Sequence, residues 1–359
     1  MSFSFGFSAE SDDEFIESGN TAQINHNELK LDQNPLDVEN SEAKAPKIED
    51  FNQVLESLVD VRITFEKVIT PQGQTVFRRE LFDVKHQLMN EEGSEKQDEE
   101  FGILMGTDTS DLQRNIYEGG LKSWECSIDT VDKLSALEDQ VLFNGEIVEL
   151  GCGTALPSTY LFQRALSSNL SNINFKLSDY NHSVLRLVTL PNLIIAWCST
   201  LSSEKLSKLQ KSGDEEIPIV DDELQLTQQL LKEFSETLKR DNIKIELYSG
   251  AWNRSFFNLI THSQTSSKIG LIITSETIYS PETLPIISEL IIELVFHSKT
   301  QQNGSPLALV AAKDIYFGVG GSLVDFENYL TTRIQQGSKF QFQTDKVKAG
   351  LQRSIVSIR

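Results

Sequence analysis

Residues 147–158 read IVELGCGTALPS, and this stretch decides the fold that the sequence predicts. Its first residues are mostly aliphatic, which indicates the end of a buried strand. A run of small residues from Gly151 to Ala155 follows, and the apolar residues of LPSTYLFQRAL after it have helical spacing. A strand, a glycine turn and a helix in this order are typical of an open α/β sheet that presents a ligand at the carboxyl ends of its strands.

The kind of ligand is narrowed by what the turn lacks. The chain has no G-x-x-x-x-G-K-[ST] pattern for phosphates, and Ala155 stands at the wrong spacing for G-x-G-x-x-G. Acidic Glu149 lies just before the turn, and Gly151 and Gly153 carry no Cβ, so the backbone can approach a ligand closely. These features favour S-adenosylmethionine, because its small amino-acid end carries an ammonium for an acid to meet. An ordinary strand-to-helix turn fits a short G-x-G equally well.

The charge of the chain limits its partners. A formal net charge of −21 and a pI of about 4.7 argue against a nucleic-acid-binding groove, which needs basic residues to neutralise phosphates. An acidic protein favours basic partners, such as ribosomal proteins or histones. No apolar run approaches the roughly 20 residues that span a bilayer, and no secretory signal pattern is present. We therefore expect no membrane contact.

Cysteine and histidine usage indicates the compartment and the absence of a metal site. Cys126, Cys152 and Cys198 are isolated and odd in number, which predicts reduced thiols in a cytoplasmic or nuclear protein. The histidines are scattered, so we expect no metal site. We expect the protein to be a monomer.

Composition divides the chain into three parts. Residues 1–48 are acidic and poor in aliphatics, and we expect a disordered arm that includes the phenylalanines of SFSFGFS, either a docking motif or a start without a role. Residues 49–114 are expected to form an N-terminal extension that packs on the main domain or covers its site. Residues 115–359 form the main domain. Within it, residues 200–242 are interpreted as an acidic helical insertion, useful for a partner or a simple surface excursion.

Hydrophobic periodicity predicts the remaining elements. SVLRLVTLPN (183–192) is expected to be a helix that ends before Pro191, and LIIAWCS (193–199) the next strand. Residues 77–88 are expected to be a strand, and residues 90–102 a charged, solvated loop. Further strands are expected at 173–181, 243–252, 270–274, 306–313 and 350–359, a short helix leading into a strand at 48–68, and helices around 124–134 and after a glycine-rich loop at 317–321.

Several candidate site residues lie at the carboxyl ends of these strands. Asp179 ends the second strand, where a carboxylate would accept both ribose hydroxyls of an adenosine. Trp252 ends a later strand, close to where an adenine could stack. Trp124 is either a core anchor or, with Glu125, part of the pocket wall.

Seven peptides together resemble the histidine protein methyltransferases of the seven-β-strand class. They are YEGGLKSWEC (117–126), VELGCGTALPS (148–158), SDYN (178–181), VTLPN (188–192), SGAW (249–252), TSETIYSP (274–281) and AAKDIYFGVGG (311–321). The resemblance covers residue 51 to the end. It implies a seven-β-strand, Rossmann-like α/β fold, with a mostly parallel twisted sheet, helices on both faces and an N-terminal extension. Ala155, where many members have glycine, and Glu149, where some have aspartate, are modest departures.

The resemblance also implies a reaction and a binding site. The family transfers a methyl group from S-adenosylmethionine to a histidine nitrogen of the third large-subunit ribosomal protein, in support of ribosome biogenesis and translation. The implied cofactor contacts are Ser123, Trp124, Glu125, Cys126, Ser127, Glu149, Gly151, Gly153, Asp179, Tyr180, Asn181, Gly250, Ala251, Trp252 and Ser275.

Methyl transfer to histidine requires orientation of the substrate more than it requires a strong base. The donor is already activated, and a histidine with a pKa of about 6.5 is largely neutral at pH 7, so a hydrogen bond that fixes its tautomer is the main need. Our hypothesis is that Glu276 or Tyr279, with the loop at residues 317–321, positions the imidazole. Glu276 alternatively closes the sheet edge or contacts the cofactor.

Other functions remain open at this stage. A protein lysine methyltransferase would share the fold, and an acidic ribosome-assembly factor would keep the fold only to bind a basic ribosomal protein. A nicotinamide oxidoreductase is disfavoured by the incomplete glycine fingerprint.

Overall fold

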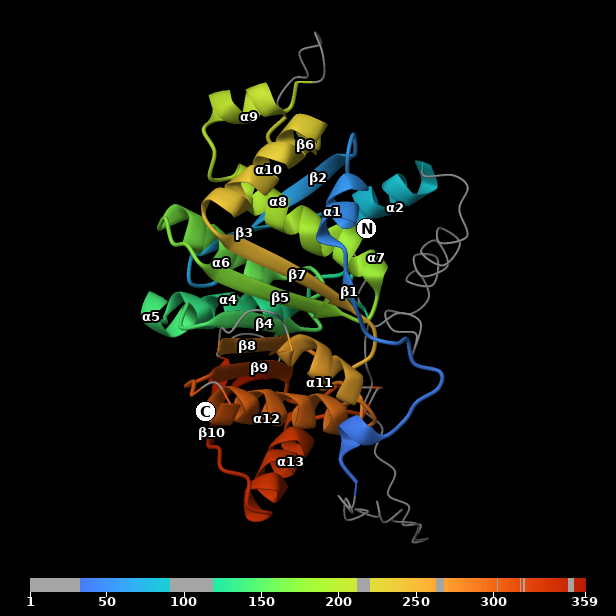
Figure 1. Cartoon of the computed structure of the whole chain (residues 1–359), viewed down its shortest axis with the longest axis vertical. Coiled ribbons are helices and arrows are strands. Elements are labelled where there is room, and N and C mark those ends of the chain that lie inside the picture. The colour runs from blue at the N-terminus through green and yellow to red at the C-terminus, as the bar shows by residue number, and fades with distance from the viewer. Residues whose placement is uncertain are drawn as a thin grey trace, which may run out of the picture. The chain divides into compact units, whose positions relative to one another are not determined.

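The computed structural model describes residues 33–90, 119–211, 220–262, 268–301, 303–316, 318, 320–347 and 352–359. At their centre lies an eight-stranded sheet with the order β1-β7-β5-β4-β8-β9-β11-β10 (Figure 1). Its strands are β1 (Lys47–Glu49), β4 (Glu146–Leu150), β5 (Ile173–Asp179), β7 (Ile243–Ser249), β8 (Ile269–Ser275), β9 (Leu307–Lys313), β10 (Phe342–Val347) and β11 (Arg353–Ile358).

The sheet is mostly parallel, as the sequence predicts. The pairs β4–β5, β4–β8, β5–β7 and β8–β9 are parallel. The two ends of the sheet are antiparallel, since β1 pairs with β7, and β11 pairs with β9 and β10. Reversal of strand order on either side of β4 makes the carboxyl end of β4 the point where such sheets bind ligands.

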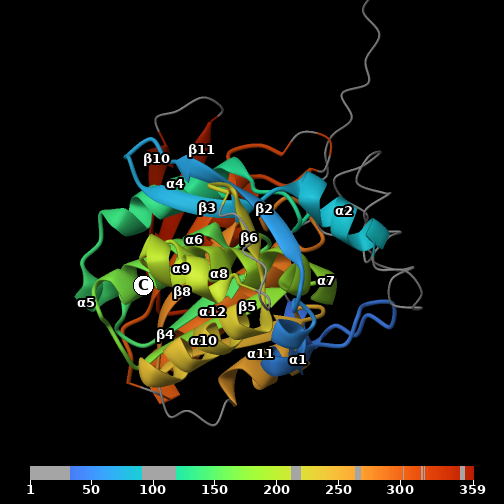
Figure 2. The same cartoon turned by 90° about the horizontal axis from the view of Figure 1, so that it is seen from above.

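Helices cover both faces of the sheet, which confirms the predicted doubly covered architecture (Figure 2). The helices α4, α6 and α8 pack on one face, and α11 and α12 on the other, with α13 packed on α12. The bounds are α1 (Phe51–Glu56), α2 (Leu81–Asn90), α4 (Glu125–Ser135), α5 (Asp139–Leu142), α6 (Leu156–Ser167), α7 (His182–Val184), a π-helical turn (Leu185–Thr189), α8 (Leu190–Cys198), α9 (Ser203–Leu209), α10 (Gln228–Arg240), α11 (Arg254–Thr261), α12 (Leu284–Gln301) and α13 (Leu323–Gln335).

The stretch IVELGCGTALPS folds as its pattern predicts. All five residues of β4 are buried, as expected of a central parallel strand covered on both faces. Gly151 and Gly153 have φ values of 63° and 51°, in the left-handed region that favours glycine. Ala155, at φ 51°, precedes α6, whose first turn contains Pro157. Strand, glycine turn and helix are therefore confirmed.

A second, three-stranded antiparallel sheet lies outside the helical layer. It has the order β3 (Thr75–Arg79), β2 (Arg62–Ile69) and β6 (Glu223–Gln225), and β3 packs against α6 and α8. The short helix and strand expected at residues 48–68 are α1 and β2, which confirms that part of the pattern. The charged loop expected at residues 90–102 lies almost entirely outside the described residues.

The strand expected at LIIAWCS is wrong, because these residues belong to α8. Every residue of α8 is buried, so the run is apolar on all sides and its periodicity does not distinguish a buried helix from a buried strand. The helix that was expected to end before Pro191 continues through it. Pro191 lies in the first turn of α8, directly after the π-helical turn, where the missing N–H is tolerated.

Two further elements differ from the sequence pattern. The strand expected at residues 77–88 ends at Arg79, and α2 begins at Leu81, because buried Val84 and Gln87 follow helical and not alternating spacing. The edge strand β10 was not predicted. Its residues FQTDKV are only partly buried, so they lack a continuous apolar signal.

The helix expected within residues 200–242 is α10, and its packing differs from that of a simple surface excursion. Phe234 of α10 is fully buried and forms edge-to-face contacts with Trp197 of α8 and Phe162 of α6. The helix α10 is therefore part of the core that leads into β7. The boundary at residue 48 also differs, since Pro35–Asp37 forms a 3-10 turn with Leu36 buried, and β1 extends the main sheet. Residues 1–32 lie outside the described residues.

Candidate active site

A cavity of about 390 Å³ lies at the carboxyl ends of β4, β5, β7 and β8. It is bounded by the glycine turn after β4 and by the residues that end the other three strands. Its mixed lining of backbone, aromatic and acidic groups is typical of a small-molecule site. The edge of the sheet at which the sequence predicts a site therefore holds a cavity.

The glycine turn is fixed by buried hydrogen bonds from several directions. The Cys152 N–H donates to the Ser178 carbonyl at 2.8 Å. Thr189 Oγ1 donates to the Gly153 carbonyl at 2.6 Å, and Asn192 Nδ2 donates to the Thr154 carbonyl at 2.8 Å. Residues of the peptide VTLPN therefore hold the turn in place, a role that the sequence alone did not show.

No side chain fits at Gly151. A Cβ there would lie 2.7 Å from Thr277 Cγ2 and 3.3 Å from Trp252 Cη2. At Gly153 a Cβ would approach the Gly120 carbonyl oxygen to 3.0 Å. The turn is thus packed between the loop that follows β8 and the loop that precedes α4.

Asp179 connects the ends of β4 and β5. Its Oδ2 accepts from the Gly153 N–H at 3.0 Å, and its Oδ1 accepts from the Asn181 N–H at 3.1 Å. The side chain is buried and lines the cavity. Because each carboxylate oxygen can accept more than one hydrogen bond, Asp179 can still accept from ligand hydroxyls.

Glu149 is the most deeply buried acid of the site. Its Oε2 accepts from the Ser158 N–H at 3.0 Å, at the start of α6. Burial raises the pKa of Glu149 to about 8, and the hydrogen bonds from Ser158 oppose that rise. A cationic ligand group beside Glu149 would favour the charged form of this carboxyl.

The segment Gly250–Trp252 meets a segment from the N-terminal part of the chain. The Gly250 N–H donates to the Tyr180 carbonyl at 3.1 Å, and the Ala251 N–H donates to the Lys44 carbonyl at 2.9 Å. A Cβ on Gly250 would lie 2.6 Å from the Ala45 carbonyl oxygen, so glycine is required for this close approach. Trp252 turns back toward Gly151 and closes the cavity from that side.

The segment Ser275–Tyr279 ends β8 and lines the cavity beside the glycine turn, since Thr277 lies against Gly151. Glu276 has a φ of 59°, in the left-handed region, and its N–H donates to the Ala311 carbonyl at 2.8 Å. Such a conformation costs about 1–3 kcal/mol in a residue with a side chain and is common at functional sites. The Gly321 N–H donates to the Tyr279 carbonyl at 2.8 Å, so the described part of the glycine-rich loop contacts this segment. Phe317 and Val319 lie outside the described residues.

Glu276 belongs to a charged group beside the cavity. Its Oε1 accepts from the Cys126 N–H at 3.3 Å, and its Oε2 lies 3.5 Å from Lys313 Nζ. Lys313 also lies 3.1 Å from Glu125 and 5.2 Å from the centre of the Trp124 ring. Burial lowers the pKa of Lys313, but the charges of the two glutamates raise it above its ordinary value. Lys313 therefore fixes the Glu276 carboxylate at the cavity wall.

Three relatives identify the family. The chain is 45% identical to Histidine protein methyltransferase 1 of Saccharomyces cerevisiae, over all of this chain and 98% of the yeast protein. It is 36% identical to the protein of the same name from Schizosaccharomyces pombe, over 72% of this chain and 69% of that protein. The chain belongs to the histidine protein methyltransferase family. A bovine homolog is 30% identical over 69% of this methyltransferase and 57% of its own length.

Two other comparisons add little. No family model matches the methyltransferase. A solved structure from Listeria monocytogenes, described as a class I S-adenosylmethionine-dependent methyltransferase, aligns with 77% of this chain and 68% of its own at 12% identity, with a TM-score of 0.35. A likeness this weak supports no conclusion, and the fold is established by the strand order above.

The predicted methyl donor, S-adenosylmethionine, fits the residues of this cavity. Asp179 offers acceptors for ribose hydroxyls, Glu149 for a cationic amino-acid end, and the glycine turn leaves room for close approach. Trp252 offers an aromatic face to a base. In the part of the methyltransferase that the structure describes, no group of three or more His, Cys, Asp or Glu could hold a metal ion.

The structure places most of the predicted site residues around the one cavity. Those that line it are Trp124, Ser127, Glu149, Gly151, Gly153, Asp179, Tyr180, Gly250, Ala251, Trp252, Ser275, Glu276 and Tyr279. Four others lie behind the wall: Ser123 contacts Thr154 Oγ1 at 2.9 Å, Glu125 pairs with Lys313, and Cys126 and Asn181 donate backbone N–H groups to Glu276 and Asp179. We expect these four to support the site without direct contact.

Sequence reasoning missed a set of cavity residues far from the motifs. Pro35, Val38, Asn40 and Ala43 come from the arm that was expected to be disordered. The pattern Asn34-Pro35 was a usable signal, because Asn at the N-cap followed by Pro is a helix start, and Asn34 Oδ1 does accept from the Leu36 N–H at 2.9 Å. Thr277, Ser280 and Thr283, after β8, were missed as well.

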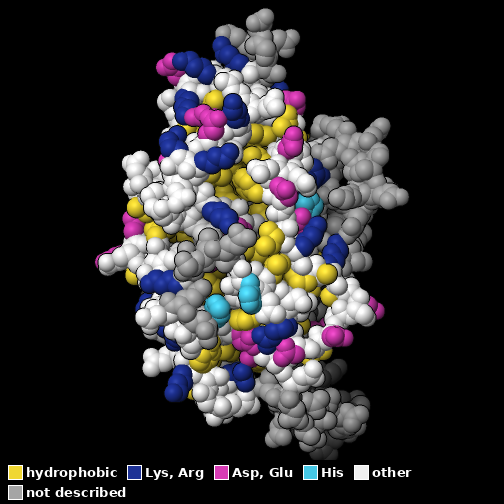
Figure 3. Space-filling view, viewed as in Figure 1, with side chains coloured by type: hydrophobic (Ala, Val, Ile, Leu, Met, Phe, Trp, Pro, Cys, Tyr) yellow, Lys and Arg dark blue, Asp and Glu magenta, His cyan; other side chains and the backbone are white. Residues whose placement is uncertain are grey.

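The remaining sequence predictions concern the surface and the thiols. The three cysteines are free and buried, and burial raises the pKa of each thiol above its ordinary range. None of the described helices is long and apolar enough to cross a membrane. On the face shown in Figure 3, the described lysines and arginines are interspersed with acids and form no broad basic area.

Proposed function

We propose that this methyltransferase transfers a methyl group from S-adenosylmethionine to a histidine nitrogen of a basic ribosomal protein. The names of its relatives and the −21 charge of the chain support a basic protein substrate. The third large-subunit ribosomal protein is the specific substrate that the sequence motifs imply, with a role in ribosome biogenesis. The observation that carries the proposal is that the glycine turn and the segment Ser275–Tyr279 face one cavity.

The reaction needs two groups held in line. S-adenosylmethionine supplies an activated methyl group at this site. The residues Glu149, Gly153 and Asp179 hold one side of the cavity in a fixed geometry, because their hydrogen bonds are buried. In that transfer the lone pair of one ring nitrogen of the neutral substrate imidazole would bond to the methyl carbon as the methyl–sulfur bond breaks and S-adenosylhomocysteine leaves. The proton on the other ring nitrogen would then be lost.

Glu276 is the residue best placed to orient that imidazole. Its carboxylate is fixed by Lys313 and by the Cys126 N–H, and it lines the cavity. A carboxylate that accepts a hydrogen bond from one ring N–H leaves the lone pair on the other nitrogen. Tyr279, whose backbone is held by Gly321, lines the same part of the cavity. The alternative, that Glu276 only holds the start of α4 through Cys126, rests on the same contact.

Glu276→Gln separates these two roles, with Glu125→Gln as the matched control. Both glutamates pair with Lys313, but only Glu276 lines the cavity. We expect Glu276→Gln to lower turnover about 100-fold at unchanged donor affinity, within the range of proton-handling groups. We expect Glu125→Gln to stay within about threefold of the unchanged enzyme. Full turnover of Glu276→Gln with normal donor affinity would remove the orienting role.

The substrate is tested by labelling. Ribosomal proteins from cells without the enzyme are incubated with isotope-labelled S-adenosylmethionine, and mass spectrometry locates the methyl group. A methyl group on histidine supports the proposal, whereas one on lysine shows a lysine methyltransferase of the same fold. The cavity favours an enzyme over a non-catalytic assembly factor. If a Gly151→Arg variant supports normal ribosome assembly in those cells, the assembly-factor function is the correct one.

A further inference from the structure

The segment of residues 34–46, here called the strap, runs past the carboxyl ends of the strands between α12 and β1 (Figure 1). Four of its residues, Pro35, Val38, Asn40 and Ala43, line the cavity. None of them belongs to a motif of the methyltransferase family peptides. The strap is therefore a wall of the site that lies outside the seven peptides quoted above.

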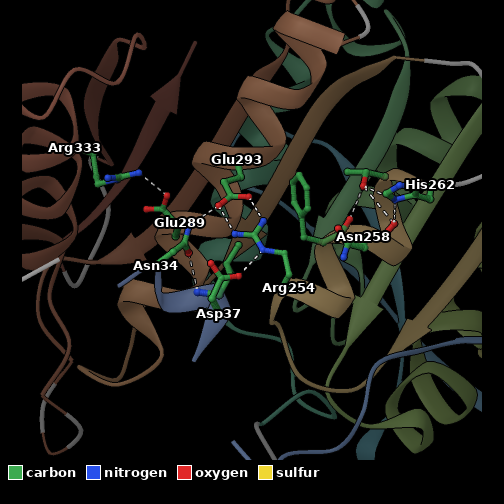
Figure 4. A network of polar contacts seen from close by, with 11 residues as sticks. Asn34, Asp37, Arg254, Asn258, His262, Glu289, Glu293 and Arg333 are labelled. Atoms are coloured by element: carbon green, nitrogen blue, oxygen red, sulfur yellow. Dashed lines mark hydrogen bonds and ion pairs between the residues drawn. The ribbon is translucent and has the colours of Figure 1, made fainter. Parts of the chain in front are cut away.

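The first end of the strap is anchored to α11 and α12 (Figure 4). Asn34 Nδ2 donates to Glu293 Oε1 at 2.6 Å, and Arg254 Nε donates to Asp37 Oδ1 at 2.7 Å. Arg254 Nη2 also donates to Glu293 Oε1 at 2.8 Å, so one arginine joins the strap to α12. Leu36, between Asn34 and Asp37, is 1% exposed. A buried leucine and a polar clasp thus hold this end.

The second end is anchored to β5 and β7. The Lys44 N–H donates to Tyr180 Oη at 3.2 Å, and the Lys44 carbonyl accepts from the Ala251 N–H at 2.9 Å. Three residues further on, β1 pairs with the end of β7. Tyr180 and Ala251 both line the cavity, so the strap crosses the side of the site at which β5 and β7 end.

The middle of the strap forms a turn of its own. The Ala43 N–H donates to the Asn40 carbonyl at 3.2 Å, and the Glu42 N–H donates to Asn40 Oδ1 at 3.1 Å. Val38 lines the cavity and yet is 54% exposed. An apolar side chain in that position faces both solvent and the site. It would lose exposed surface if a ligand filled the cavity.

We propose that the strap is a movable wall of the methyl-donor pocket, and that Leu36 with the Asp37–Arg254–Glu293 clasp positions it for donor binding. This inference rests on the proposed function, because it concerns the same donor. The donor enters when the strap lifts between its anchors and is retained when the strap closes. Leu36 and Asp37 are positioning residues, since neither lines the cavity.

The principal test compares Leu36→Ala with Leu209→Ala. Both substitutions remove a buried leucine, 1% and 6% exposed, but Leu209 ends α9 and does not line or anchor the strap. If Leu36→Ala leaves the strap closed in about one molecule in ten, the Kd for S-adenosylhomocysteine, measured by calorimetry, rises about tenfold. We expect Leu209→Ala to leave that Kd within twofold. An equal effect of the two variants overturns the proposal.

A second measurement needs no variant. Hydrogen exchange of the full chain is followed by mass spectrometry with and without S-adenosylhomocysteine. We expect residues 38–43 to exchange more slowly with the ligand, together with residues 151–154. Protection of residues 151–154 alone would show that the strap does not close on the donor. Failure of the unchanged protein to bind the ligand at all would instead contradict the proposed function.

Discussion

The cavity has two walls that are built in different ways, the glycine turn (residues 151–155) and the strap (residues 34–46). The turn is held by buried hydrogen bonds, which Thr189 and Asn192 donate and Asp179 accepts. The strap is held at its first end by a clasp whose Asp37 and Arg254 side chains are 46% and 33% exposed. Exposed ion pairs contribute little to stability, typically about 0–1 kcal/mol. The turn is therefore a fixed surface, and the strap an adjustable one.

The largest effect on donor affinity is expected for Gly151→Ala, which alters the fixed wall. The matched control is Gly73→Ala, because Gly73 also has a positive φ, 84°, but a Cβ added there would meet no atom within 4 Å. Both variants carry the cost of a left-handed backbone, about 1–2 kcal/mol. Only alanine at 151 also meets Thr277. We expect the donor Kd to rise about 30-fold for Gly151→Ala and to stay unchanged for Gly73→Ala, as measured by calorimetry. Equal donor affinity in both variants would show that the turn does not form the donor surface.

Two smaller and opposite effects are expected for Glu149→Gln: a higher stability of the ligand-free protein and a weaker affinity for the donor. Because the pKa of Glu149 is raised from 4.5 to about 8, the folded state binds more protons than the unfolded state between these pH values. The contribution of Glu149 to stability therefore falls as the pH rises from 4.5 to 8. Glutamine removes this penalty, so the melting temperature of the ligand-free protein should rise at pH 8, by about 3 °C, and much less at pH 5.

Glu149→Gln should also raise the Kd for the donor about tenfold, because the ammonium of the donor then has no carboxylate partner at this position. Exposed Glu138→Gln is the control and should change neither quantity. A lower melting temperature of Glu149→Gln at pH 8 would mean that the carboxylate is needed to hold Ser158 and the start of α6.

The smallest effect on donor affinity is expected when salt weakens the clasp that holds the strap. The measurement compares about 0.05 M with about 0.5 M salt, a range over which exposed ion pairs become screened. The higher salt concentration should weaken the Asp37–Arg254–Glu293 clasp. We expect the Kd for S-adenosylhomocysteine to rise about twofold to threefold in the unchanged protein. In Asp37→Asn the Kd should already be raised at low salt and then respond less. If the Kd rises by the same factor with salt in both proteins, the clasp does not contribute to donor binding.

The two walls also differ in how far the sequence predicts them. The strand, the glycine turn and the helix lie in one continuous peptide, so local spacing predicts all three. Asp179 was placed by the same logic, because it ends the neighbouring strand. The strap has no such pattern. Its acidic, aliphatic-poor composition predicts disorder, and its first end is held by contacts with α11 and α12, more than 200 residues away in the sequence.

Other errors have a related physical cause. The run LIIAWC is buried on all sides, so it lacks the polar face that would reveal a helix. The bracing roles of Thr189 and Asn192 depend on the π-helical turn beside them, which no spacing rule predicts. Glu276 was predicted from its place at the end of β8, but its partner Lys313 lies on β9, and their meeting depends on the parallel pairing of these strands.

The pairing of β1 with β7 has a consequence for how copies of this protein behave toward one another. Without β1, β7 would be the outer strand of the main sheet, and exposed strand edges invite pairing with other molecules. β1 covers only Leu247–Ser249. The first half of β7 carries Lys244 and Glu246, whose ion pair of 2.5 Å places charge along the remaining edge. Removal of residues before 50 would therefore expose backbone donors and acceptors and favour self-association, even in a chain that retained its whole methyltransferase core.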